Sequence, residues 1–411
     1  MSNAPPHRLP AYAVFAALLS AAGLPIYIHA PKFYVDEYGV SLAALGAVLF
    51  GLRLLDVVQD PLFGRLSEAL RGRRGLAVLI GCSVMALSML GLFAVPPLLP
   101  PLVWFALMLT GVFSAFSFLT INFYAQGVVK AGHLPGDGHL GLARWRETGA
   151  LLGVCVAAIA PVMLGGMMGA PFAGFAAGFA VLALAAVIMM WGEWGDAGLP
   201  PSIGLRAVLG DALARRLLLI AFVNAAPAAV SSTLFLFFVE SRLEAPGLEG
   251  PLLLLFFLSA ALAAPVWGKL AERFGVKHVL LGAMILAIFS FGGATLLGPG
   301  DWVAFAVICA LSGATLGADL TLLPAVFASR MARISPSAAE GFGLWSFVSK
   351  FTLAFAAVTL LPALQNAGFD SASASNPPQA LALLTILYAA VPCGLKVVAI
   401  ALLATTNLKE T

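Results

Sequence analysis

Residues 64–74 read GRLSEALRGRR, and residues 268–277 read GKLAERFGVK. Each stretch follows an apolar run and combines a glycine, an acid four residues later and a basic cluster. The two glycines are 204 residues apart (268 minus 64), which is about half of the 411-residue chain. A repeat at this spacing predicts a chain built from two related halves.

The sequence on either side of these stretches is that of a membrane protein. The chain is 61% hydrophobic and 10% charged, whereas about 25% of the residues in soluble domains are charged. This composition excludes a disordered chain, a coiled coil, a nucleic-acid binder and a soluble enzyme with one anchor helix. Apolar runs of about 20 residues, enough to cross the hydrocarbon core as a helix, recur from end to end.

We therefore expect an all-α membrane protein with twelve transmembrane helices in two pseudo-symmetric six-helix bundles. The predicted spans are Tyr12–Phe33, Leu42–Leu66, Leu76–Val95, Leu102–Val128, Leu142–Leu164, Pro171–Trp191, Leu217–Val239, Pro251–Leu270, Val276–Leu297, Trp302–Ala328, Phe342–Leu364 and Ala380–Thr405. The longest polar interval predicts an N-terminal bundle over residues 1–191, a cytoplasmic linker over 192–216 and a C-terminal bundle over 217–411. The first apolar run reads as a membrane helix and not as a removed signal peptide.

Basic residues predict the orientation of these spans, because Lys and Arg accumulate in cytoplasmic loops. Alternate loops place 17 basic residues on one side and two, Lys32 and Arg242, on the other. Both termini are thus expected in the cytoplasm, in a cell (inner) membrane. The 17 are Arg8, Arg65, Arg71, Arg73, Arg74, Lys130, Arg144, Arg146, Arg206, Arg215, Arg216, Lys269, Arg273, Lys277, Arg330, Arg333 and Lys409.

The repeated loop predicts a gate at the cytoplasmic surface. A small residue lets two helices approach closely, and the acid and basic cluster beyond it can form ion pairs that break when the gate opens. The alternative is simple accumulation of positive charge on the cytoplasmic side. The predicted gate residues are Gly64, Glu68, Arg71, Arg73, Arg74, Gly268, Glu272 and Arg273.

The second span carries two acids on one face. Asp56 and Asp60 lie one helical turn apart, and Arg53 shares their face. Ionisable groups within hydrocarbon are costly and usually mark an ion or substrate pathway. Two ionised carboxylates this close repel, so we expect a proton or a Na⁺ ion between them, with Gln59 as a further ligand. In the alternative, Arg53 neutralises one acid and the face only packs.

Two lysines and one further acid lie in later spans. Lys350 is well inside an apolar run, so we expect it to pair with a carboxylate or, alternatively, to extend to the membrane interface. Lys396 lies nearer the cytoplasmic end of its span and is expected to extend to the interface. Asp319 forms either a second polar site or a structural hydrogen bond between helices.

Spans four and five contain candidate solute ligands. Arg146 opens span five, where its guanidinium group can hold an anionic or hydroxyl-rich solute with two parallel hydrogen bonds. The alternative is an exposed charge that only sets the topology. Thr120, Asn122, Tyr124 and Gln126, at the end of span four, are polar groups that occupy more than one face of the helix, so about half of them are expected to reach a cavity.

Several of these segments resemble one transporter family. Residues 33–41 and 53–64, Arg146, the Gly317-Ala318-Asp319 motif and the segment from Trp345 to Lys350 are similar to the glycoside–pentoside–hexuronide:cation symporters. These are the melibiose-carrier-like members of the major facilitator superfamily. The repeated loop also resembles the loop motif of that superfamily, although Glu68 and Glu272 stand where Asp is more usual.

The resemblance implies roles for individual residues. It makes Asp56 and Asp60 the cation-binding carboxylates, with Gln59 in place of the usual Asn, and Lys350 the lysine of span eleven near that site. It makes Arg146 a sugar-facing arginine. Ser20 and Thr120 stand where sugar-transporting members carry carboxylates. The resemblance therefore supports cation coupling in this protein more strongly than it supports specificity for sugars. The remaining expected solute ligands are Trp345 and Asp319.

Together these features predict a secondary active transporter that works by alternating access. Symport of a small polar solute, namely a sugar, glycoside or uronate, with H⁺ or Na⁺ is expected; an uncoupled facilitator or a carrier of anionic or lipid-like solutes is the alternative. We expect no enzyme activity, no nucleic-acid partner, no cofactor besides the coupling ion, and a monomer in the lipid bilayer. Cys82, Cys155, Cys309 and Cys393 show no metal-binding spacing.

Overall fold

A computed structural model of the chain describes residues 8–134, 138–165, 169–195, 204–334, 338–369 and 376–408. Within these ranges the chain is helical, with turns between the helices and no strand. The α-helices are α1 (Leu9–Ala21), α2 (Leu24–Tyr38), α3 (Leu42–Ala69), α4 (Arg74–Phe93), α5 (Pro101–Ala131), α6 (Gly138–Gly165), α7 (Pro171–Met190), α8 (Leu205–Gly210), α9 (Ala212–Phe237), α10 (Glu249–Phe274), α11 (Val276–Gly292), α12 (Trp302–Ile334), α13 (Ala339–Asn366), α14 (Pro378–Thr385) and α15 (Val391–Ala404).

These helices confirm the expected all-α membrane fold. In the part of the chain that the structure describes, nine helical segments are long and apolar enough to cross a membrane, counting α9 with its π-helical end as one segment and α14 with α15 as another. The α1–α2 pair, α3 and α13 occupy the other three predicted spans. The helices thus correspond to the twelve spans predicted from the sequence.

The first predicted span is broken. The prediction of one helix over Tyr12–Phe33 was wrong, because α1 ends at Ala21 and α2 begins at Leu24. The interruption lies at Gly23, and a proline occupies the first turn of α2. A proline has no N–H to donate and disfavours helical geometry in the residue before it, so a new helix starts here more easily than the old one continues.

The chain divides into two compact units. One comprises Met1–Val208 and Met331–Phe347, and the other comprises Leu209–Arg330 and Val348–Thr411. The beginning of α13 therefore belongs to the N-terminal unit and the rest of α13 to the C-terminal unit. The domain boundaries predicted from the sequence, with a linker over 192–216, stay a prediction.

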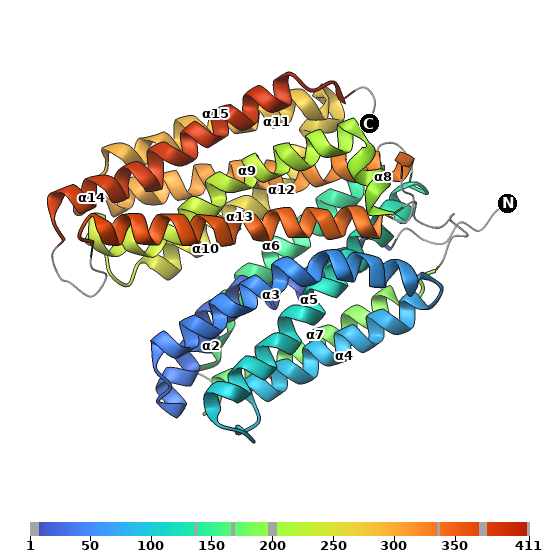
Figure 1. The fold of residues 1–411 in the computed structure, drawn as a ribbon, viewed down its shortest axis with the longest axis horizontal. Helices are drawn as coiled ribbons and strands as arrows, with labels where there is room; N and C mark the ends of the chain where they lie inside the picture. The colour runs from blue at the N-terminus through green and yellow to red at the C-terminus, as the bar shows by residue number, and fades with distance from the viewer. Residues whose placement is uncertain are drawn as a thin grey trace. The chain divides into compact units, whose positions relative to one another are not determined.

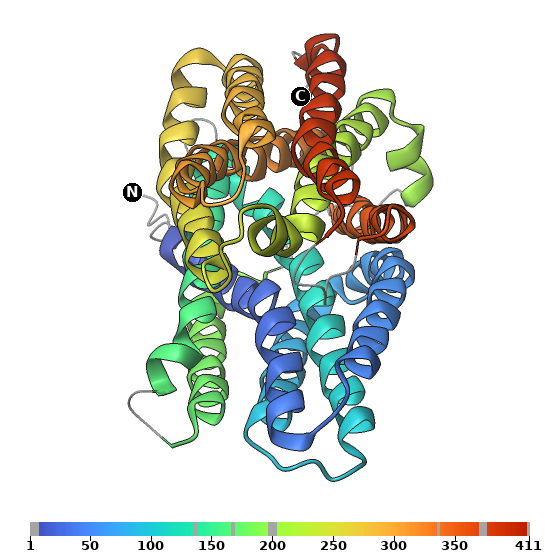
Figure 2. The same ribbon diagram turned by 90° about the vertical axis from the view of Figure 1, so that its left-hand side faces the viewer.

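In the N-terminal unit, α1 packs against α6 and α7, α4 packs between α5 and α7, and α3 packs along α5. Figure 1 shows α3, α5, α4 and α7 side by side, and Figure 2 shows the same unit as a bundle of roughly aligned helices. Gly149 and Gly153 of α6 face the backbone of Ala13 and Ala17 of α1 so closely that an added Cβ would clash. Small residues four apart give this close approach, as in many membrane helix pairs.

The C-terminal unit has a separate core. Its α15 packs against α9 and α11, and α11 packs against α10. Phe238, at the π-helical end of α9, stacks on Tyr388 with ring centroids 4.1 Å apart, and Phe305 packs beside them. Gly313 and Gly317 of α12 approach the backbone of α10 as closely as α6 approaches α1.

Candidate functional site

A row of hydrogen bonds joins α3 and the start of α4 to α5. The two residues of each pair are 52 to 57 positions apart in the sequence. A pair that lies later in α3 or α4 also has its partner later in α5. This nearly constant offset means that α3 and α5 run parallel and in register. The pairs are Gln59 with Ser114, Asp60 with Ser117, Ser67 with Asn122, and Arg74 with Gln126.

Asp60 lies at the centre of this row and is fully buried. The hydroxyl group of Ser117 donates to its Oδ1 atom. The hydroxyl group of Ser346, from the beginning of α13, donates to its Oδ2 atom at 2.7 Å. Both carboxylate oxygens of Asp60 thus accept hydrogen bonds from other helices, which offsets part of the cost of burying the group.

Asp56 lies one turn earlier on α3 and is also buried. Gln59 Nε2 donates to Asp56 Oδ1 at 2.7 Å, and the Oε1 atom of the same amide accepts from Ser114 at 3.0 Å. The structure thus gathers the three predicted cation ligands, Asp56, Gln59 and Asp60, at the α3–α5 interface. The side chain of Arg53, the predicted counter-charge, lies outside the described residues.

Two facing glycines bring α13 close to Asp60. An added Cβ on Gly64 would lie 3.2 Å from the carbonyl oxygen of Ala339, and one on Gly343 would lie 3.1 Å from the carbonyl oxygen of Asp60. Such contacts are tighter than ordinary van der Waals distances, so the two helices meet backbone to backbone. This approach brings Ser346 within reach of the buried carboxylate.

The serines around the acids were missed by the sequence analysis. Ser114 and Ser117 lie three residues apart on one face of the helix, within an apolar stretch, and this pattern could have revealed them. Nothing in the sequence indicates that Ser346 is a partner of Asp60, because 286 residues separate them.

Arg146 lies in a second buried cluster of the N-terminal unit. Its Nε atom contacts Glu147 Oε1 at 2.7 Å, the hydroxyl group of Tyr124 donates to the same oxygen at 3.1 Å, and the guanidinium carbon lies 3.8 Å from the Tyr124 ring centroid. Arg146 is 5% exposed, which argues against a surface charge that only sets topology. Its Nη2 atom has no hydrogen-bond partner among the described residues.

The two copies of the repeated loop differ in their surroundings. In the first, Arg71 lies 3.6 Å from Glu68 across one helical turn, and Arg74 is buried and donates to Gln126 at 3.0 Å. In the second, Glu272 and Arg273 are exposed. Gly268 is buried, like Gly64, and Arg73 is exposed.

The other predicted solute ligands occupy varied positions. Asn122 is buried, donates to the carbonyl oxygen of Phe118 and accepts from Ser67. Thr120 has a buried hydroxyl group without a hydrogen-bond partner in the described ranges. Ser20 and Trp345 are half-buried, as is Lys350, which belongs to the C-terminal unit.

The prediction for Lys396 was wrong. Its side chain is 7% exposed, forms an ion pair with Asp319 and donates to Asn224 Oδ1 at 2.7 Å. Burial beside a carboxylate stabilises the ammonium group in place, so Lys396 does not extend to the membrane interface. Asn224 is a lone amide in the apolar helix α9, a signal that the sequence analysis did not use.

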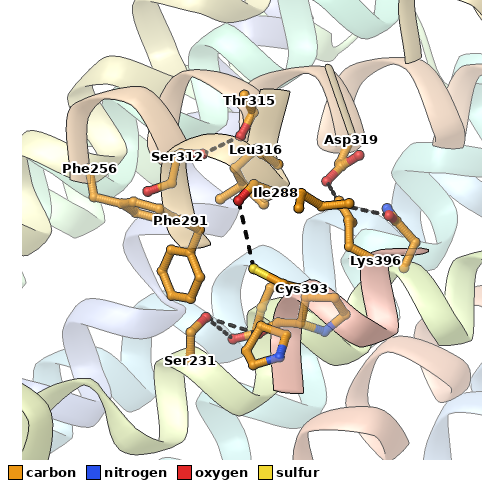
Figure 3. A pocket seen from close by; sticks show the side chains of 15 residues that line it. Ser231, Phe256, Ile288, Phe291, Ser312, Thr315, Leu316, Asp319, Cys393 and Lys396 are labelled. Atoms are coloured by element: carbon orange, nitrogen blue, oxygen red, sulfur yellow. Dashed lines mark hydrogen bonds and ion pairs between the residues drawn. The ribbon is translucent and has the colours of Figure 1, made fainter. Parts of the chain in front are cut away.

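This ion pair borders a pocket inside the C-terminal unit (Figure 3). The pocket encloses about 520 Å³ of space, including its open mouth, and lies among α9, α10, α11, α12 and α15. Within the described residues, no group of three or more His, Cys, Asp and Glu side chains could hold a metal ion.

Comparison with known proteins places the chain in a family. The family described as MFS/sugar transport protein matches residues 10–410. No curated protein matches the chain. Among solved structures, the human organic anion transporter MFSD10 (TETRAN) is 18% identical with a TM-score of 0.64, and the alignment covers 97% of this chain and 100% of that one.

A bacterial homologue of the iron transporter ferroportin, in an outward-facing state with soaked iron, is 14% identical with a TM-score of 0.69, over 96% of this chain and 98% of that one. At these identities the likeness shows the fold alone. The family match, in contrast, covers nearly the whole chain. The chain belongs to the MFS/sugar transport protein family and is therefore a multi-pass membrane transporter of the major facilitator superfamily.

Proposed function

We propose that the protein is a cation-coupled symporter of the glycoside–pentoside–hexuronide:cation type, which moves a small polar solute together with H⁺ or Na⁺. The observation that carries this proposal is the fully buried Asp60, whose two carboxylate oxygens accept from serines of two other helices. Asp56 and Gln59, buried beside it, complete a set of oxygen ligands. Hard cations such as Na⁺ prefer oxygen ligands, and a carboxylate can equally take a proton.

The coupling follows from how cation binding changes the hydrogen bonds of Asp60. An ionised Asp60 accepts from both Ser117 and Ser346, as observed. A protonated carboxyl group carries its own donor, and a Na⁺ ion needs the serine oxygens as ligands. In either case at least one of the two serines no longer donates to Asp60 as observed, so the contact of α3 with α5 or with the beginning of α13 changes. A ligand shifts a conformational equilibrium only through such a difference between states.

Lys350 and Arg53 are the proposed counter-charges in this cycle. When the cation leaves, a lysine or arginine that pairs with the acids keeps the emptied site neutral, so the empty carrier can reorient. In the proposed orientation the protein lies in the cell (inner) membrane as a monomer with both termini in the cytoplasm.

The proposed solute is a sugar, glycoside or uronate, which the family description supports. The buried Arg146, with a free Nη2 atom and Tyr124 stacked beneath it, is the proposed solute ligand in the N-terminal unit. The same free donor favours the second candidate, a carrier of anionic solutes, because guanidinium groups bind carboxylates with two parallel hydrogen bonds.

The first experiment identifies the solute. Purified protein is heated with single sugars, glycosides, uronates and organic acids, with and without Na⁺ at two pH values. A solute that binds the folded state raises the melting temperature, and in a symporter this rise depends on Na⁺ or on pH. A rise with organic acids alone, independent of both ions, would favour the anion carrier.

The second experiment tests coupling by gradient-driven uptake into proteoliposomes. The variants are Asp60→Asn and Asp56→Asn, with Glu37→Gln as the matched control because Glu37 is an exposed acid on α2. Uptake against a gradient should be lost in both aspartate variants and kept in the control, while all three remain folded. Concentrative uptake that survives both aspartate changes would refute the proposal.

A further inference from the structure

The pocket in the C-terminal unit has a charged end and an apolar end. Figure 3 shows the Asp319–Lys396 pair on one side of the lining side chains and the rings of Phe256 and Phe291 on the other. Thr315 also lines the pocket, one helical turn before Asp319 on α12. All the lining residues belong to the C-terminal unit, so the pocket is not part of the unit that carries the acids of α3.

Two side chains at the charged end can donate hydrogen bonds. Lys396 carries three N–H groups, of which two donate to Asp319 and Asn224. Asn224 also lines the pocket, and its Oδ1 atom accepts from the lysine at 2.7 Å. The Nδ2 atom of the same amide therefore points away from the lysine and carries two more N–H groups. Because the two side chains are in contact, both can donate to one anionic group.

Two other side chains at this end can accept hydrogen bonds. Asp319 accepts from Lys396 through Oδ2, and its Oδ1 atom has no partner among the described residues. The hydroxyl group of Thr315 donates its proton to the carbonyl oxygen of Ser312 at 2.8 Å, so its oxygen keeps a lone pair. Residues four apart lie on one face of a helix, so Asp319 and Thr315 can accept from one cationic group.

The charge of the pocket selects the ligand further. The side chains of Lys396 and Asp319 are 7% and 10% exposed and neutralise each other. A ligand with one net charge would carry that charge uncompensated into a largely buried site, which is costly. A zwitterion adds no net charge, and it can place its anionic group beside Lys396 and its cationic group beside Asp319. Its hydrogen bonds are charge-assisted, and such bonds are stronger than those of an uncharged molecule.

The spacing of these groups indicates which zwitterion fits. Lys396 and Asp319 are in direct contact, so the two charged groups of the ligand must also lie close together. An α-amino acid carries its ammonium and carboxylate groups on the same carbon atom. The apolar end of the pocket, with the rings of Phe256 and Phe291, then receives an apolar side chain.

We propose that this pocket binds an α-amino acid with an apolar side chain as its zwitterion. The carboxylate group of the ligand accepts from Lys396 and Asn224, and its ammonium group donates to Asp319 and Thr315. The bound molecule thereby connects α9, α12 and α15. The assignment does not depend on cation coupling at Asp60, because the pocket and the acids of α3 belong to different units.

Equilibrium binding to the detergent-purified full-length protein tests this assignment. The probes are radiolabelled L-leucine and L-phenylalanine, and at least one of them should bind saturably. The competitors lack one charge each: isoamylamine and isocaproate match leucine, and phenethylamine and hydrocinnamate match phenylalanine. Each competitor should bind at least about tenfold more weakly than its amino acid, the effect of losing a hydrogen bond to a charged group. D-glucose should not compete.

Two variants locate the binding. Thr315→Val should raise the Kd of the amino acid about tenfold, and it keeps the fold because the lost hydroxyl group bonded only within α12. Asn224→Asp keeps an acceptor for Lys396 but removes two N–H donors and adds a negative charge. It should weaken binding of the amino acid at least about tenfold and strengthen competition by the matched amine, a reversal that a purely structural role would not produce.

Thr233→Val is the matched control. The hydroxyl group of Thr233 donates to the carbonyl oxygen of Ala229 within α9, and Thr233 does not line the pocket, so binding should not change. Absence of binding by both amino acids, equal competition by the amine or the acid, displacement by D-glucose, or a Kd unchanged in both pocket variants would each overturn the assignment. Uptake by Asp60→Asn is a separate measurement, so its outcome does not bear on this one.

Discussion

Replacing Lys396 with methionine should destabilise the folded protein by about 3–5 kcal/mol, the usual cost of removing one partner of a buried ion pair. The structure supports the upper part of this range. Asp319 is 10% exposed and its Oδ1 atom already lacks a partner, so the substitution leaves neither carboxylate oxygen paired. The Oδ1 atom of Asn224 also loses its donor.

The double variant Asp319→Leu/Lys396→Met tests the reason for this loss. Replacing both charges with apolar side chains removes the uncompensated carboxylate, and such exchanges are often neutral. Only the Asn224 amide then lacks its partner, at a cost of about 1–3 kcal/mol. The double variant should therefore be more stable than Lys396→Met alone.

Unfolding of the detergent-purified protein, followed by tryptophan fluorescence, measures these differences. Lys277→Met is the matched control, because Lys277 also donates two hydrogen bonds, here to the carbonyl oxygens of Ala404 and Thr406, at a more exposed site. Water reaches this site and can replace the lost bonds, so we expect a smaller loss than in Lys396→Met. A Lys396→Met variant as stable as the wild type, or a double variant less stable than either single one, would refute the reasoning.

Three further predictions concern other parts of the chain. Gly64→Ala should lose about 1–3 kcal/mol of stability, because the added methyl group overpacks against α13. Gly46→Ala should not lose this stability, because an added Cβ there meets nothing within 4 Å. Equal melting temperatures of the two variants would contradict this prediction. Arg146→Lys should lower solute uptake about tenfold without unfolding, because lysine cannot form two parallel bonds; unchanged uptake would exclude Arg146 as a ligand. The hydrogen bond from Arg330 lowers the pKa of Asp211 at the start of α9. The ion pair therefore contributes its full stabilisation at pH values above the ordinary aspartate pKa. That contribution is lost as the pH falls through the lowered pKa of Asp211 in the folded protein. When the pH is lowered, the melting temperature of Asp211→Asn should therefore fall less than that of the wild type.

The two units use corresponding helix pairs in different ways. The second and fourth spans of the N-terminal half, α3 and α5, are joined by hydrogen bonds that include Asp60 and Gln59. The equivalent pair in the C-terminal half, α10 and α12, meets at Gly313 and Gly317 with backbone against backbone. A polar side chain still bridges this pair, because Trp267 Nε1 of α10 donates to the carbonyl oxygen of Ala314 of α12 at 2.7 Å, but the contact uses a ring N–H and a backbone carbonyl where α3 and α5 use an acid, an amide and hydroxyl groups.

The sequence by itself determined the class of the protein and the number of its spans. Membrane helices are encoded locally, since about 20 consecutive apolar residues are needed to cross the hydrocarbon core. It also determined that Asp56 and Asp60 share a face, because the helical period converts a spacing of four residues into one turn. The break at Gly23 was equally local, but apolarity on both sides of Gly23 concealed it.

Only the tertiary structure decided which groups meet. Lys396 pairs with Asp319 from 77 residues away, and Ser346 reaches Asp60 across 286 residues. Partners such as these depend on which faces two helices turn toward each other and on how closely their backbones approach, as at Gly64 and Gly343. Hydropathy does not record these properties, because the same apolar run can face lipid, a neighbouring helix or a buried charge.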